Sequence, residues 1–276
     1  MHLLLDPWQH AFMQHAALEL AIIAALTGVL GCWIVLYELS YSAESLAHGL
    51  LPGLVGATLL GLPLLLGAAV GIGAGALGIA LAATIPTISR DTAVAIVITT
   101  LFGLGVLLAL SPASPPGIQT LLFGDPLAVT DGDLVTTLML SALALAALAA
   151  LHRLLLAVGF DRGGARALGV RPFVVELALI ALVAVAILVA VQALGNLLVV
   201  AILIAPAATA RLLAHRLPAM MGIATVVGIG GSIGGLYVSY YAGLAAGASI
   251  ALVLVGAFML AFAAGEIADQ AALGRR

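Results

Sequence analysis

The sequence contains no lysine, because all nine of its basic residues are arginine. The phosphate-binding loop of ATPases requires a lysine that reaches the nucleotide phosphates, so this chain cannot hydrolyse ATP by that route. Schiff-base chemistry, which uses a lysine amine, is excluded by the same absence. Any ATP hydrolysis coupled to this protein must therefore come from a partner chain.

Cysteine and charge are also scarce. Cys32 is the single cysteine, which excludes a disulfide within the chain and a cysteine-rich metal site. Charged residues make up 8% of the chain and hydrophobic residues 64%, whereas a soluble domain carries about 25% charged residues. This composition predicts an all-α, polytopic membrane protein surrounded by lipid, with no nucleic-acid partner.

Apolar runs long enough to cross about 30 Å of hydrocarbon follow one another along the chain. We predict a single transmembrane domain over 1–276, with a short interfacial segment at 1–16. The predicted spans lie near 18–37, 45–62, 64–85, 92–111, 133–152, 173–192, 194–211, 217–238 and 246–265. The loop that carries Glu38 and Glu44 has no arginine to place it, so the prediction is eight or nine spans.

The arginines indicate an orientation. With nine spans, every arginine lies in connections on one side, which the positive-inside rule makes cytoplasmic. These residues are Arg90, Arg153, Arg162, Arg166, Arg171, Arg211, Arg216, Arg275 and Arg276. The acidic connection with Asp125, Asp131 and Asp133 is then expected outside, as is the N-terminus.

Glu44 and His48 form the candidate site. They are four residues apart, so on a helix they share one face and could hold one cation or share a proton. An ionisable residue inside a span is costly and indicates a transport pathway. Pro52 and Gly53 follow, and we expect them to kink or partly unwind the helix beside the pair. The alternative is that Glu44 reaches the membrane surface and His48 is a buried histidine bonded to a carbonyl.

The connection at 160–171 has the signals of a short cytoplasmic helix. Asp161 is a good N-cap, Gly169 a good C-cap and Pro172 a stop, which predicts a helix from Arg162 to Leu168. Such a helix is too short to be stable alone. Arg162 and Arg166 share a face and Leu168 adds an apolar contact, so docking on another protein and a plain positively charged loop are both open.

Several stretches together resemble one family, the integral-membrane permeases of bacterial ABC importers for zinc, manganese and iron. The stretch from Glu44 to Gly53 resembles that family's acid-x-x-Ser-His-Ala-x-Leu-Pro-Gly motif, and Asp91-Thr92-Ala93 resembles its Asp-Thr-Ala segment. Four more stretches follow in the family's order: Leu122-Phe123-Gly124, Phe160-Asp161 with Ala167-Leu168-Gly169, Pro206 to Arg211, and Leu236 to Tyr241. The resemblance covers nearly the whole chain.

The resemblance implies a permease subunit in the bacterial inner membrane, not an enzyme in itself. Its implied partners are cytoplasmic ATPase subunits, an extracellular or periplasmic metal-binding protein and a second permease, most simply a copy of the same chain. Glu44 and His48 match the acid and the histidine of the translocation path. Asp161, Arg162, Arg166, Leu168 and Gly169 match the coupling helix that enters a groove of the ATPase.

One carboxylate and one imidazole suit transient binding of Zn²⁺ or Mn²⁺, with no tightly bound cofactor. We expect zinc first, with manganese or iron as alternatives. The family usually has Asp where this chain has Glu44, and it usually has basic residues where this chain has Tyr37 and Glu38.

Two other functional classes are considered. A proton-coupled secondary transporter of a small solute could use Glu44 and His48 as a proton relay. That class typically has paired broken helices, and this sequence offers one, at Pro52, with only a weak counterpart at Pro206. An intramembrane enzyme has no support, because no Gly-x-Ser-x-Gly or His-Glu-x-x-His motif occurs.

Overall fold

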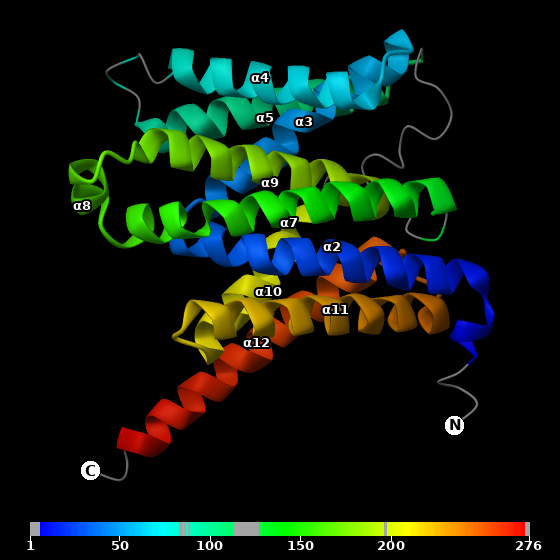
Figure 1. Ribbon diagram of the computed structural model, residues 1–276. Helices are drawn as coiled ribbons and strands as arrows, with labels where there is room; N and C mark the ends of the chain where they lie inside the picture. Colours follow the sequence, from blue (N-terminus) through cyan, green and yellow to red (C-terminus); the bar gives the residue numbers. More distant parts are fainter. Residues whose placement is uncertain are drawn as a thin grey trace.

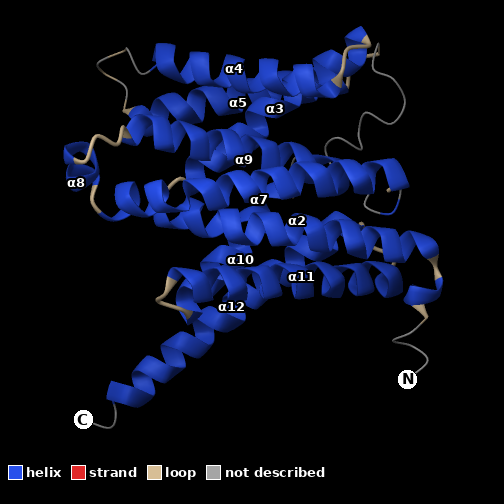
Figure 2. Cartoon of the chain, viewed as in Figure 1, coloured by secondary structure: helices blue, strands red, loops and turns tan. Residues whose placement is uncertain are grey.

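The computed structural model describes residues 6–82, 85, 87, 89–112, 127, 129–195 and 198–273. Every regular element in this part of the chain is helical, as predicted (Figure 2). In chain order the elements are η1 (Pro7–Gln9), α2 (Ala11–Leu36), α3 (Ser40–Leu60), α4 (Leu64–Ala82), α5 (Arg90–Ala109), α7 (Asp131–Phe160), α8 (Arg162–Ala167), α9 (Pro172–Leu194), α10 (Val199–Leu213), α11 (Leu217–Ala242) and α12 (Ala246–Leu273).

Each predicted span coincides with a helix, but the count of eight or nine membrane crossings is not confirmed. Among the described residues, six helices are long and apolar enough to cross a membrane: α2, α5, α7, α9, α11 and α12. The apolar part of α4, Leu66–Gly78, and the whole of α10 are shorter. The predicted interfacial segment divides between η1 and the first turns of α2, and residues 1–5 lie outside the described part.

The helices run back and forth across a layered bundle (Figure 1). The C-terminal end of α4, the start of α5, α8, the turn between α10 and α11 and the C-terminal end of α12 lie at the left end of the view, whereas η1 and the start of α7 lie at the right. Arg90, Arg162, Arg166, Arg211 and Arg216 therefore belong to one end of the bundle, as the charge pattern predicts.

Glycines allow α3 and α4 to pack with their backbones in contact. A Cβ atom added at Gly53 would lie 2.0 Å from the carbonyl oxygen of Gly67, and one added at Gly71 would lie 2.6 Å from the carbonyl oxygen of Gly49. Side chains at these positions would force the helices apart, because real Cβ contacts are longer. Gly67 and Gly71 of α4 therefore lie on a packing surface, which is typical of small residues at four-residue spacing.

Pro52 lies inside α3, which the structure extends without interruption from Ser40 to Leu60. The helix is therefore not unwound at Pro52, and the kink that was the other expected outcome stays a prediction. Pro52 still has no N–H, so it cannot donate the usual helical hydrogen bond to the carbonyl of His48. The proline thus leaves a backbone acceptor at the same residue whose side chain belongs to the candidate site.

Candidate cation pocket and the α8 corner

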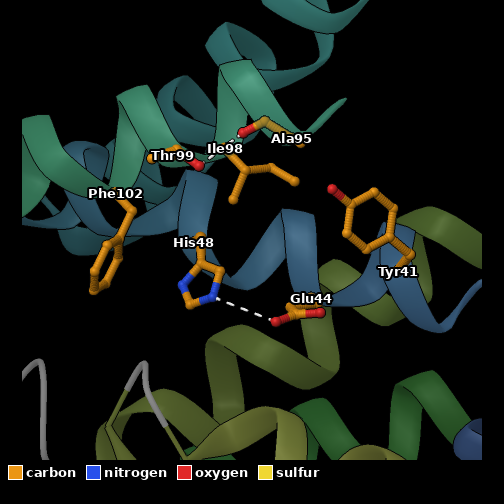
Figure 3. Close-up of a pocket in the computed structure, with 7 residues that line it drawn as sticks. All are labelled: Tyr41, Glu44, His48, Ala95, Ile98, Thr99 and Phe102. Carbon is orange, nitrogen blue, oxygen red and sulfur yellow. Dashed lines mark hydrogen bonds and ion pairs between the residues drawn. The ribbon is translucent and has the colours of Figure 1, made fainter. Parts of the chain in front are cut away.

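Glu44 and His48 line one pocket of about 310 Å³ between α3 and α5. Figure 3 shows both side chains extending from the same side of α3, with residues of α5 opposite. The other lining residues are Tyr41, Ala95, Ile98, Thr99 and Phe102. Counting 1.5 Å per helical residue, His48 lies about 12 Å from the start of α3 at Ser40.

The two ionisable groups are close enough to share a cation. His48 Nε2 lies 3.9 Å from Glu44 Oε1, and two metal–ligand bonds of about 2.1 Å each reach this separation. The Glu44 side chain is 49% exposed and that of His48 20% exposed. An exposed carboxylate and a half-buried imidazole suit a site that binds a cation and releases it.

The ring of His48 is fixed by its surroundings. Its centroid lies 4.8 Å from that of Phe102 in an edge-on arrangement. Its Nδ1 atom is buried and has no hydrogen-bond partner in the described part of the chain. Nε2, which lies on the Glu44 side of the ring, is therefore the nitrogen available to a cation.

The described residues contain no cluster of three or more histidine, cysteine, aspartate or glutamate side chains that could hold a metal ion. A cation at Glu44 and His48 must complete its coordination with water, with backbone carbonyls or with groups from another chain. Transient binding of a cation at Glu44 and His48 stays a prediction.

Sequence reasoning missed the side of the pocket formed by α5. Thr99 and Phe102 belong to an apolar span whose pairing with α3 no local pattern reveals. Thr99 Oγ1 donates to the carbonyl of Ala95 at 2.8 Å, so its hydroxyl is held within its own helix. Tyr41 could have been found, because it precedes Glu44 by three residues and shares its helix face.

The second predicted feature, the short helix at 160–171, forms with Asp161 as its N-cap, as predicted, but with Leu168 and not Gly169 as its C-cap. The carboxylate of Asp161 accepts hydrogen bonds from the backbone N–H groups of Gly163 and Gly164, at 3.0 and 2.9 Å. The helix ends one residue before the predicted position, at Ala167, and Gly169 follows with a φ of 80°. This left-handed conformation is the reason for a glycine at that position.

The face of α8 differs from the prediction in one respect. Arg162 is not free for a partner, because its guanidinium pairs with the carboxylate of Glu176 on α9. Leu168 is 82% exposed, and Arg166 is exposed as well. The free surface of this corner is therefore more apolar than the two arginines suggest.

Tyr37 links this corner to the end of α2. Its hydroxyl donates to the carbonyl of Leu155 on α7 at 2.7 Å. Burial, and after it the carboxylate of Glu176, raises the pKa of Tyr37 to about 12, while Arg162 acts in the opposite direction. The hydroxyl therefore stays protonated and keeps this hydrogen bond at physiological pH.

Comparison with known proteins identifies the chain. The model of the ABC 3 transport family matches residues 9–265. The chain belongs to this family. The manganese transport system membrane protein MntC of Listeria innocua is 34% identical over 254 residues, covering 92% of this chain and 91% of that protein. A probable iron transport system membrane protein of Haemophilus influenzae is 32% identical over 264 residues, covering 96% and 97%.

Solved structures agree with this placement in the ABC 3 transport family. PsaBC from Streptococcus pneumoniae, in complex with Fab, matches with a TM-score of 0.88 and 31% identity over 95% of this chain and 94% of that chain. A putative metal-chelate type ABC transporter in an inward-facing conformation matches with a TM-score of 0.66 at 17% identity, which supports the fold alone. The predicted resemblance to metal-ion ABC permeases and the predicted multi-pass location in the inner membrane are confirmed. The expectation of zinc as the first substrate is not confirmed, because the relatives from Listeria innocua and Haemophilus influenzae are named for manganese and iron.

Proposed function

We propose that this protein is the permease subunit of an ABC importer that carries Mn²⁺ or Fe²⁺ across the inner membrane, with Glu44 and His48 as a transient binding station. The observation that carries the proposal is the pocket between α3 and α5 in which Glu44 Oε1 and His48 Nε2 lie 3.9 Å apart. Relatives named for manganese and iron support the choice of metal.

Oxygen and imidazole ligands suit both dications, and softer sulfur ligands are absent from the pocket. The cation exchanges part of its water shell for the Glu44 carboxylate and His48 Nε2. Because two protein ligands hold it weakly, it can leave when the surrounding helices move. A tight site would bind the cation but would not release it.

The energy comes from other chains, because this sequence has no lysine with which to form a phosphate-binding loop. Cytoplasmic ATPase subunits dock at the α8 corner, and a solute-binding protein delivers the metal from outside. A second permease, most simply a copy of this chain, faces the open side of the Glu44 pocket and contributes further ligands or water.

Metal uptake into proteoliposomes that contain the full complex tests this proposal. Accumulation of Mn²⁺ or Fe²⁺ should require ATP and the binding protein, and should exceed that of Zn²⁺ when each metal is offered alone. Uptake that follows an imposed proton gradient without ATP would instead support the proton-coupled secondary transporter. Preferred uptake of Zn²⁺ would overturn the choice of metal while leaving the transport mechanism in place.

A further inference from the structure

A second, polar pocket of about 500 Å³ lies where the turn between α2 and α3 meets the corner between α7 and α8. Its lining residues are Leu36, Tyr37, Glu38, Val158, Gly159, Phe160, Asp161 and Arg162, and none of them lines the cation pocket. It is built from helix ends at the arginine-bearing end of the bundle (Figure 1). A ligand here would therefore approach from the aqueous side and not from lipid.

Some of the charged side chains that line this pocket have partners within the protein, and one does not. Asp161 uses its carboxylate to cap α8, and Arg162 is paired with Glu176. Glu38 is exposed, and its side chain has no hydrogen bond or ion pair with any described residue. Because Arg162 is already neutralised by Glu176, the pocket keeps a net negative charge that a cationic group can satisfy.

Large apolar side chains are exposed at the same corner of the bundle as this pocket. Phe160, which lines it, is 73% exposed, and Leu168 and Phe173 on either side of the connection to α9 are 82% and 74% exposed. Phe160 ends α7, Leu168 directly follows α8 and Phe173 lies in the first turn of α9. Aromatic and aliphatic side chains exposed around a polar cavity are typical of a protein–protein contact.

We propose that this pocket receives an arginine or lysine side chain of the ATPase subunit, while Phe160, Leu168 and Phe173 form the apolar contact around it. This inference rests on the proposed function, since it names a contact within the same complex. Glu38 precedes Glu44 by six residues, and the pocket also contains the corner that leads into α8. An ATPase arginine or lysine held in this polar pocket joins the ATPase to both α8 and the beginning of α3. Movement of the ATPase is then passed to α3, the helix that carries Glu44 and His48.

Substitutions at Glu38 test the charge separately from the backbone. Glu38 has a φ of 58°, a left-handed conformation that asparagine adopts more readily than glutamate. Loss of function in Glu38→Asn therefore reports the missing carboxylate and not a strained turn. Glu38→Arg adds repulsion, and Glu266→Arg makes the same charge change at an exposed position on α12, outside the pocket.

Affinity of the purified ATPase subunit for each permease variant in nanodiscs gives the measurement. We expect about a fivefold loss for Glu38→Asn, a larger loss for Glu38→Arg and no change for Glu266→Arg, with a weaker dependence on salt in both Glu38 variants. In the Glu38→Arg background, exposed arginines and lysines of the ATPase are then changed one at a time to glutamate. One of these reversals should restore binding.

Binding by Glu38→Arg equal to that by Glu266→Arg overturns the inference, and so does a loss that no reversal restores. Leu168→Asp separates this result from a failure of the proposed function. If Leu168→Asp releases the ATPase but Glu38→Arg does not, the docking at α8 stands. The inference that the Glu38 pocket receives a basic side chain of the ATPase is then wrong. If neither variant changes ATPase binding, the α8 corner is not the docking site.

Discussion

The two ring nitrogens of His48 have different surroundings, and this difference assigns their roles. Nδ1 is buried without a partner among the described residues, while Nε2 lies 3.9 Å from Glu44. In the proposed binding station, the Glu44 carboxylate attracts a dication and the imidazole supplies one neutral ligand. The pair could be predicted from sequence because both residues lie on one helix at a spacing of four. Their contact with Thr99 and Phe102 could not, because it depends on which helix packs against α3.

Removal of either ligand should stop transport without unfolding the protein. We expect His48→Ala to abolish uptake of Mn²⁺ in proteoliposomes, and Glu44→Gln to reduce it at least about tenfold, because a neutral amide binds a dication poorly. Glu44→Asp keeps the charge and should be tolerated or should shift the preference among Mn²⁺, Fe²⁺ and Zn²⁺.

Thr58→Ala is the matched control for these variants. Thr58 lies on the same helix, bonds only to the carbonyl of Leu54 at 2.9 Å, and does not line the pocket. Uptake of Mn²⁺ by the Thr58→Ala variant should equal that by the unchanged protein. Normal uptake by His48→Ala, at equal expression and with the ATPase still bound, would remove His48 from the pathway.

At the scale of helices, α3 is held by backbone contact with α4. Gly53 and Gly67 each meet the other's carbonyl oxygen, at 2.0 and 2.3 Å from an added Cβ. Small residues at four-residue spacing are typical of close helix packing, but such a spacing does not reveal the partner helix. Glycines therefore stabilise the position of α3, and through it the position of Glu44 and His48.

A single methyl group should show how tight this contact is. Gly53→Ala forces α3 and α4 apart and should lower stability by about 1–3 kcal/mol, the usual effect of overpacking. Gly56→Ala is the control on the same helix, because nothing lies within 4 Å of an added Cβ there. Thermal unfolding in detergent, followed by loss of helical signal, should give a lower midpoint for Gly53→Ala alone. Equal midpoints would mean that α3 and α4 do not pack this closely in solution.

The short helix α8 shows both the reach and the limit of local sequence signals. Asp161, Gly169 and Pro172 gave its boundaries within one residue, because caps and stops act on neighbouring backbone groups. The pairing of Arg162 with Glu176 was not predicted, because Glu176 lies on the following helix. This pairing leaves Leu168, 82% exposed, as the main contact that α8 offers.

A charge at Leu168 should therefore be more harmful than the loss of Arg162. Leu168→Asp should release the ATPase or separate ATP hydrolysis from metal uptake, because it places a carboxylate in an apolar contact. Arg162→Ala should do less, since an ion pair exposed to solvent contributes about 0–1 kcal/mol. ATPase retained on affinity-purified permease, together with ATP hydrolysed per metal ion imported, measures both effects. If Leu168→Asp keeps the ATPase bound and ATP hydrolysis coupled to metal uptake, residues 160–171 are only a positively charged connection.

At the scale of the whole molecule, arginine placement predicted the two ends of the bundle better than apolar length predicted the number of crossings. Nine apolar runs became helices of 15 to 30 residues, and α10 and the apolar part of α4 are shorter than a bilayer usually requires. Such helices depend on their neighbours for burial, which composition alone does not reveal. The back-and-forth path nevertheless brings the arginine-bearing connections to one end.

Cysteine labelling in intact cells tests which end is cytoplasmic. Asp131 begins α7 with a 91% exposed side chain, and Arg166 is exposed on α8 at the other end of the bundle, so both positions can react if reagent reaches them. Asp131→Cys leaves the capping pair of Thr130 and Asp133 in place, and Cys32, which is buried, is first changed to alanine. An impermeant maleimide should label residue 131 in intact cells and residue 166 only after the membrane is opened. The opposite labelling pattern would mean that the protein has the opposite orientation in the membrane. The α8 helix would then lie on the side where no ATPase can reach it.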